Sequence, residues 1–109
     1  GIDVLKDRVL FRENEEGRIE NVYMLKIVNK AQRQLTFQIT ADGLDGLVYE
    51  GQQKVVAAEG EILTIPAELS IDPEKLPSST NDIEFHIQAI EDPGIKAEAE
   101  SRFIGPAVR

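Results

Sequence analysis

Apolar side chains occupy every second position of residues 83–89, and polar side chains occupy the positions between them. The apolar set is Ile83, Phe85, Ile87 and Ala89, and the polar set is Glu84, His86 and Gln88. Because successive side chains of a strand point to opposite faces, this period of two predicts a strand with one apolar and one polar face. Residues 91–94 then predict a turn, and the alternation resumes at Ile95, so the segment is predicted to be a β-hairpin.

The returning strand of this hairpin carries charge on its outward positions. Lys96, Glu98, Glu100 and Arg102 are expected to face water, and Ala97, Ala99, Ser101 and Phe103 are expected to face inward. A sheet with one apolar face must bury that face against another layer, which favours a two-layer sandwich.

Shorter segments with the same character precede the hairpin. They predict strands over residues 2–11, 19–28, 35–40, 47–49, 54–58 and 61–66. Polar and glycine-containing stretches predict turns or loops at residues 12–17, 29–34, 42–46 and 59–60. Residues 72–79 form the longest irregular connection, in which Pro73 favours a single helical turn.

Particular positions within these strands carry more specific expectations. Asp7 and Arg8 indicate that the first strand lies at a sheet edge, where charge is tolerated. Pro66 is expected at a strand end or a sheet edge, because proline lacks the N–H that a ladder needs. In residues 19–28, one face is expected to hold Ile19, Tyr23, Leu25 and Ile27, and the other face or its margins Glu20, Asn21, Met24, Lys26 and Val28.

About seven short strands separated by turn signals are what an immunoglobulin-like sandwich requires. The 109 residues suit one domain with a core of its own. We therefore expect an all-β fold, an immunoglobulin-like β-sandwich of about seven antiparallel strands in two sheets, formed by residues 1–109 as a single domain. The chain enters its first strand almost at Gly1, which leads us to expect a domain excised from a longer polypeptide.

Composition and charge narrow the range of ligands. The chain has no cysteine, so disulfides, thiolate metal sites and cysteine-ligated iron–sulfur clusters cannot form within it. Its net charge of −8 repels phosphate backbones and anionic lipid, which argues against nucleic acid or a membrane surface as the direct ligand. No apolar run approaches the roughly 20 residues that span a bilayer.

Two single residues are candidates for metal chemistry. His86 is the one imidazole in the sequence, and because Phe85 and Ile87 are expected to point inward, it is expected to be a surface residue of its strand. Met24 is a soft thioether that copper could use, but one thioether without companions favours packing instead. Neither residue is assigned as a ligand.

Carboxylates occur in two groups that imitate functional sites. Asp42 and Asp45 stand three apart and are followed by hydrophobic residues, which fails the donor spacing of an EF-hand and favours a turn. Glu98 and Glu100 lie two apart on one strand face, but basic residues flank them, which indicates an exposed ion-paired face. The sequence also contains no glycine-rich phosphate loop and offers one histidine for any triad. We assign no catalytic, cofactor-binding or metal-binding residue and expect the segment to be non-enzymatic.

Several stretches resemble one known family in their order along the chain. They are residues 21–30 (NVYMLKIVNK), 36–37 (TF) leading to 43–47 (GLDGL), 83–85 (IEF) through 91–93 (EDP), and 101–106 (SRFIGP). Together they look like the C-terminal immunoglobulin-like domain of the FixG/CcoG family of cytochrome c oxidase accessory proteins. The resemblance covers nearly the entire chain.

This resemblance implies a cellular context. Members of the family are bacterial inner-membrane proteins with several transmembrane helices, a ferredoxin-type module with two [4Fe-4S] clusters, and this domain on the periplasmic side at the C-terminus. They serve assembly of cbb3-type cytochrome c oxidase, with copper reduction as the implied electron-transport activity, and the operon was named for nitrogen fixation. The clusters and the membrane helices belong to the parent protein, so no cofactor is expected in residues 1–109.

The resemblance leaves three roles open for the domain. It could dock the parent protein to a partner such as a cbb3 oxidase subunit or a copper chaperone, with an exposed sheet edge as the natural contact surface. It could instead bind copper weakly through His86, Met24 or surface carboxylates and present the metal to the parent reductase. The third role is a structural cap with no partner.

Overall fold

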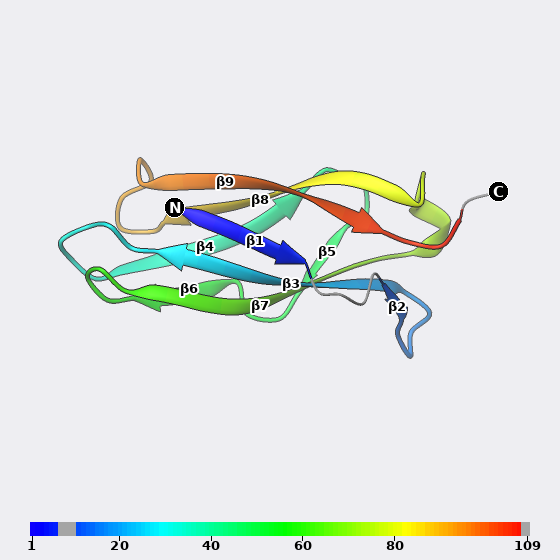
Figure 1. The fold of residues 1–109 in the computed structure, drawn as a ribbon, viewed down its shortest axis with the longest axis horizontal. Coiled ribbons are helices and arrows are strands. Elements are labelled where there is room, and N and C mark those ends of the chain that lie inside the picture. Colours follow the sequence, from blue (N-terminus) through cyan, green and yellow to red (C-terminus); the bar gives the residue numbers. More distant parts are fainter. Residues whose placement is uncertain (7–10, 108–109) are drawn as a thin grey trace.

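Two β-sheets packed face to face form the domain in the computed structural model, which describes residues 1–6 and 11–107 (Figure 1). The five-stranded sheet has the order β1-β3-β7-β5, with β2 also paired to β3, and the four-stranded sheet has the order β6-β4-β8-β9. Every pairing between described strands is antiparallel. The expected all-β, immunoglobulin-like sandwich is confirmed, although the described residues contain nine strands because two of them are very short.

The strands are bounded as follows. They are β1 (Ile2–Lys6), β2 (Arg12–Glu13), β3 (Ile19–Val28), β4 (Leu35–Asp42), β5 (Val48–Glu50), β6 (Lys54–Ala57), β7 (Ile62–Ile71), β8 (Thr80–Ala89) and β9 (Lys96–Ile104). The expected helical turn is the 3₁₀ helix η1 (Pro73–Lys75), where the carboxylate of Asp72 accepts a hydrogen bond from the backbone N–H of Glu74 at 3.0 Å. Within the described part of the chain, no helix has the length and apolarity needed to cross a membrane.

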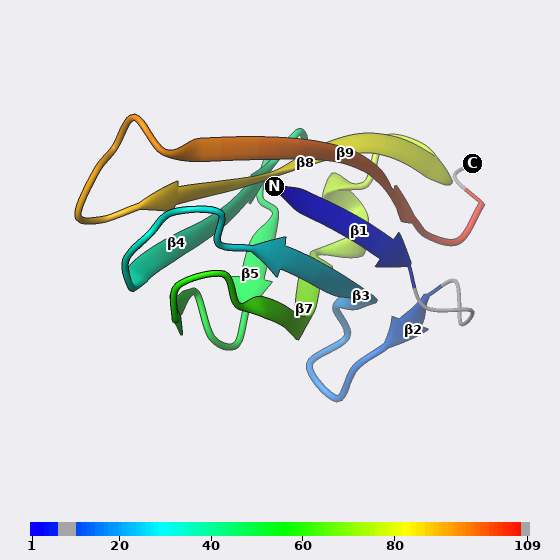
Figure 2. The same cartoon turned by 60° about the vertical axis from the view of Figure 1, so that its left-hand side comes forward.

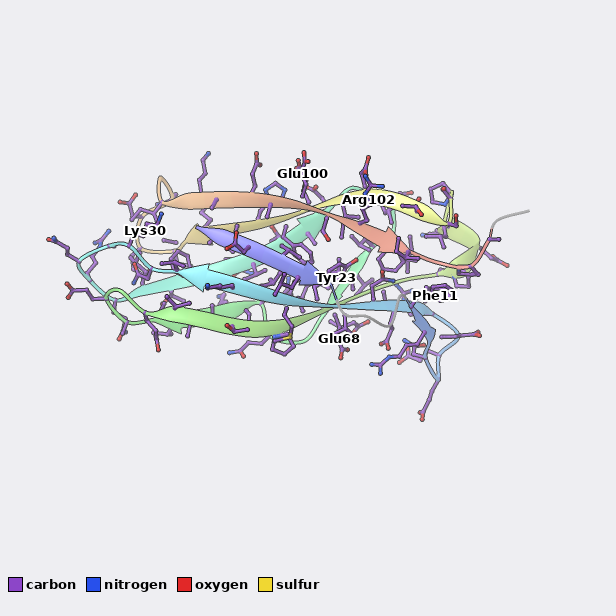
Figure 3. All side chains as sticks on the ribbon, viewed as in Figure 1. Phe11, Tyr23, Lys30, Glu68, Glu100 and Arg102 are labelled. Carbon is purple, nitrogen blue, oxygen red and sulfur yellow. The ribbon has the colours of Figure 1, made fainter. Side chains whose placement is uncertain are left out.

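Alternating side chains from both sheets fill the space between the layers. Phe37, Phe85 and Phe103 are at most 2% exposed, as the alternation predicts. The rings of Tyr23 and Phe85 meet edge to face, with centroids 5.0 Å apart and planes at 71°, a geometry that aromatic quadrupoles favour. Figure 3 shows Tyr23 between the layers.

The N-terminal expectations need correction. Within the described residues the first strand is Ile2–Lys6, at the edge of its sheet as expected, and Asp7 and Arg8, on which that expectation rested, lie outside the described residues. Residues 12 and 13 were expected in a turn but form β2, because their backbone pairs with Ile19 and Glu20 of β3. The turn itself is tighter and closes where the N–H of Gly17 donates to the carbonyl of Asn14 at 3.0 Å.

Pro66 lies inside a strand rather than at its end. The strand predicted over residues 61–66 continues to Ile71, and Pro66 sits opposite Met24 of β3. On the other side of β7, the short strand β5 pairs with residues 68–70, so among the described strands this side of Pro66 has no partner. The missing N–H therefore falls on an open sheet edge, the second of the two predicted places.

Asn21 was predicted on the outer face or its margin of β3 and is instead inside the sandwich, 1% exposed. Its side chain donates to the carbonyl of Ile104 at 2.8 Å and accepts from the N–H of Ile104 at 2.9 Å. Tyr23 adds a hydrogen bond from its hydroxyl to the carbonyl of Arg102 at 2.8 Å. These bonds join β3 of one sheet to β9 of the other, at the side of the sandwich where β1 and β9 run close together (Figure 2). A polar side chain is tolerated there because its bonding capacity is used.

Candidate functional site

The outer face of the four-stranded sheet carries the imidazole and most of its neighbouring charge. His86 is in β8, with Phe85 and Ile87 buried on the opposite face, so its predicted outward position is confirmed. Thr40 of β4 and Glu98 of β9 are its direct cross-strand partners. The side chain of His86 is nevertheless only 32% exposed, because neighbouring side chains cover it.

Next to the row of Thr40, His86 and Glu98, three carboxylates form a second cross-strand row on the same three strands. Asp42 of β4 lies opposite Glu84 of β8, and Glu84 lies opposite Glu100 of β9. Figure 3 shows Glu100 projecting away from the other sheet. Like charges at directly opposite positions destabilise a sheet, so this row favours any cation that comes to lie beside it.

The imidazole reaches into this acidic surface with both of its nitrogens. Nε2 of His86 lies 3.1 Å from Oδ2 of Asp42 and 3.5 Å from Oε2 of Glu84, and Nδ1 lies 3.6 Å from Oε2 of Glu98. Despite these distances, Nε2 is buried and makes no hydrogen bond to any described residue. One ligand atom from each of His86, Asp42 and Glu84 lies within 4.8 Å of the other two, as a metal ion would require. We call these three residues the His86 cluster.

Gly43 allows β4 and β8 to approach each other closely at one end of the cluster. Gly43 follows Asp42 with a φ of 118°, and a Cβ atom added there would lie 2.7 Å from the carbonyl oxygen of Asp82 on β8. This backbone conformation and the close approach both require glycine. Asp42 therefore lies beside Glu84, and it lines both of two adjoining open hollows in the surface.

The sequence located some of these groups and missed the arrangement. Asp42 was assigned to a turn but is the last residue of β4, and the turn begins at Gly43, while Asp45 lies exposed within that turn. Glu98 faces His86 rather than a basic neighbour. The polar alternation of β4 continues in phase to Asp42 and could have placed it outward, but only strand pairing brings it to Glu84.

Met24 is remote from His86, because it lies on the outer face of the five-stranded sheet. There it is the middle residue of a row of exposed apolar side chains on three neighbouring strands, Leu5 of β1, Met24 of β3 and Pro66 of β7. Leu5 is 69% exposed and Met24 36%. We call this feature the Leu5–Met24–Pro66 row. The fold therefore separates Met24 from His86, two of the residues that the resemblance offered as copper ligands.

Comparison with known proteins identifies the fold and the family. A family model described as "IG-like fold at C-terminal of FixG, putative oxidoreductase" matches residues 1–106. The chain belongs to this family. It is 34% identical to a FixG-related protein from Vibrio parahaemolyticus, whose crystal structure superposes with a TM-score of 0.86 over 95% of this chain and 94% of that one. The resemblance noted in the sequence is thus confirmed as membership of the FixG C-terminal domains.

Two further comparisons add no functional information. A crystal structure of a protein from Archaeoglobus fulgidus aligns over 99% of this chain and 98% of that one, at 15% identity and a TM-score of 0.49. No curated protein matches the chain in sequence.

Proposed function

We propose that the domain is a non-catalytic docking module of a membrane-bound FixG-type redox protein, on the periplasmic side of the bacterial inner membrane. The parent would carry two [4Fe-4S] clusters outside this segment and assist assembly of cbb3-type cytochrome c oxidase through copper reduction. The domain would hold the parent against an oxidase subunit or a copper chaperone. Family membership supports this context, and the surface of the five-stranded sheet supports the docking role.

The Leu5–Met24–Pro66 row is the observation that carries the proposal. Exposed apolar side chains that adjoin one another on a soluble surface are typical of protein interaction sites. A second apolar pair lies further along the same face, where Ile62 of β7 is 57% exposed and pairs with the half-buried Val28, and the polar row of Lys26 and Thr64 separates it from the first row. A partner that covered the row would bury apolar area that is now in water, which is the main favourable term in association.

The edges of the sheets are poorer contact surfaces than this face. Of the four edge strands, β5 and β6 have three and four residues, and short edge strands limit the addition of a partner strand. At the other side of the sandwich, the side chains of Asn21 and Tyr23 already bind backbone carbonyls of β9. The open face of β1, β3 and β7 is therefore the surface that we assign to the partner.

Co-purification from the native host tests this role. The intact parent protein is compared with Met24→Glu and Leu5→Asp variants and with a form that lacks residues 1–109. Both point variants should reduce the recovery of the bound partner to the level of the deletion, because a buried unpaired charge opposes binding. Val56→Glu on the outer face of the other sheet, where Val56 is 53% exposed, is the matched control. Recovery of oxidase subunits that persists after the deletion would contradict the proposal.

A further inference from the structure

We propose that the His86 cluster binds a divalent ion of a first-row transition metal through Nε2 of His86 and one carboxylate oxygen each from Asp42 and Glu84. This site is on the outer face of the four-stranded sheet and does not depend on the docking role of the other face. It gives a function to the imidazole that neither the core nor the proposed interface uses.

The distances from the imidazole nitrogen to the two carboxylate oxygens fit a metal ion of this size, and the two oxygens lie within 4.8 Å of each other. Zinc binds histidine nitrogen and carboxylate oxygen at roughly 2.0–2.2 Å, so ligands in a tetrahedral shell lie roughly 3.3 Å apart. Nε2 of His86 is 3.1 Å from Oδ2 of Asp42 and 3.5 Å from Oε2 of Glu84. The two carboxylates are on neighbouring strands and the imidazole is two residues along β8 from Glu84, so three strand backbone positions set the site.

The state of the imidazole nitrogens is a second, independent observation. Nε2 is fully covered and makes no hydrogen bond to the described residues, although the carboxylate oxygens of Asp42 and Glu84 face it at 3.1 and 3.5 Å. Covered polar atoms without a hydrogen bond are uncommon, and a metal ion shared by Nε2 and the two oxygens would account for this arrangement. Glu98 lies 3.6 Å from Nδ1, close to the place where metal-bound histidines usually have a carboxylate acceptor that orients the ring.

The charge of the surrounding face favours a dication. Asp42, Glu84 and Glu100 lie in register on three adjacent strands, and a doubly charged ion would offset the repulsion among them. Among the described residues, the neighbouring Arg102 is 3.9 Å from Asp82 and thus beside another carboxylate. Lys96 lines the hollow beside His86, and a metal ion from solution would add positive charge next to the row.

The donor atoms select the class of metal. One imidazole nitrogen with carboxylate oxygens suits Zn²⁺ or Cu²⁺, whereas Mg²⁺ and Ca²⁺ prefer shells made of oxygen alone. Cu⁺ prefers sulfur, and the thioether of Met24 is on the other sheet. We therefore expect Cu²⁺ and Zn²⁺ to bind, with Cu²⁺ tighter by the usual order of stability.

Calorimetric titration of the 109-residue chain tests the site. The Vibrio parahaemolyticus relative, of which this chain covers 94%, shows that a chain of this extent folds by itself. Zn²⁺ should bind one ion per chain with saturable heat, and Mg²⁺ and Ca²⁺ should not. His86→Ala should abolish the saturable heat, and Asp42→Asn and Glu84→Gln should weaken it. Glu98→Gln should lower affinity by ~10-fold, as expected for an orienting carboxylate.

Matched controls and a spectroscopic signature separate this site from general acidity. Glu74→Gln removes the same charge in η1, and Gln88→Ala alters the same strand face; both should leave Zn²⁺ affinity unchanged. With Cu²⁺, electron paramagnetic resonance should show coupling to one imidazole nitrogen, and His86→Ala should remove it. No saturable binding, equal binding of Ca²⁺, or a nitrogen signal that survives His86→Ala would each overturn the proposal.

Discussion

Replacement of Asn21 by alanine tests whether its side chain closes the sandwich. Asn21 is 1% exposed, and its amide exchanges two hydrogen bonds with the backbone of Ile104, at 2.8 and 2.9 Å. Alanine keeps the strand position but leaves the N–H and the carbonyl of Ile104 without these partners. The two sheets would then lose the Asn21 part of the side-chain link between β3 and β9, while the bond from Tyr23 to Arg102 stays.

The magnitude follows from the two backbone groups that lose their partners. A buried polar group left unpaired costs roughly 1–3 kcal/mol, so two groups cost about 2–6 kcal/mol. Ile104 is half-buried, so water can reach part of it and the lower half of this range applies. We therefore expect Asn21→Ala to reduce the free energy of unfolding by about 2–4 kcal/mol. Each kcal/mol would lower the Tm by roughly 4–8 °C in a domain of this size.

Urea unfolding followed by circular dichroism measures this loss. Gln34→Ala, in an exposed loop position, is the matched amide control and should change stability by less than about 0.5 kcal/mol. Tyr23→Phe removes one hydrogen bond to the same strand and should cost about 1–2 kcal/mol. A loss below about 1 kcal/mol in Asn21→Ala would show that water replaces both bonds and that the link does not stabilise the fold.

Three further predictions concern the core and the ionisable groups. Phe37→Ala and Phe85→Ala should each cost about 3–5 kcal/mol in urea unfolding, and losses below about 1 kcal/mol would contradict their buried positions. The backbone N–H of Thr36 donates to both carboxylate oxygens of Glu91, at 2.8 and 3.0 Å, which lowers the pKa of Glu91 from its ordinary 4.5. Because the pKa of Glu91 is lower in the folded state, these hydrogen bonds add to the free energy of unfolding above pH 4.5, and this stabilisation is lost as the pH falls through the folded pKa. Glu91→Gln should therefore flatten the acid side of the curve of stability against pH, and an unchanged curve would contradict this. Burial raises the pKa of Tyr49 to about 12, so its phenolate absorbance should appear well above the ordinary pKa of 10, and ionisation near pH 10 in the folded domain would refute the burial.

The alternation of side chains predicted the faces of the last two strands because burial of one strand face is a local, repeating property. Phe85 and Phe103 lie inside, and His86 and Glu98 lie outside, as their positions in the period of two require. The turn at Gly60 could also be predicted from the sequence, because glycine readily adopts a positive φ, which is 71° here. These features depend on neighbours a few residues away.

Asn21 shows where this reasoning fails. Its position in the period of two places it with Tyr23 on the inner face, but its polarity suggested the outer one. A buried amide becomes favourable only when a distant backbone completes its hydrogen bonds, and Ile104 is 83 residues away in the chain. The sequence contains no local sign of that partner.

By itself, the sequence determined that this chain is an all-β sandwich, which side chains of the last two strands face inward, and that it resembles the FixG C-terminal domains. Only the tertiary structure decided that Asp42 and Glu84 lie beside His86, and that Leu5, Met24 and Pro66 form one apolar row. Which residues face inward depends on alternation along a single strand, whereas which residues meet on a face depends on the register between strands distant in the chain. Both surfaces to which we assign a function are products of that register.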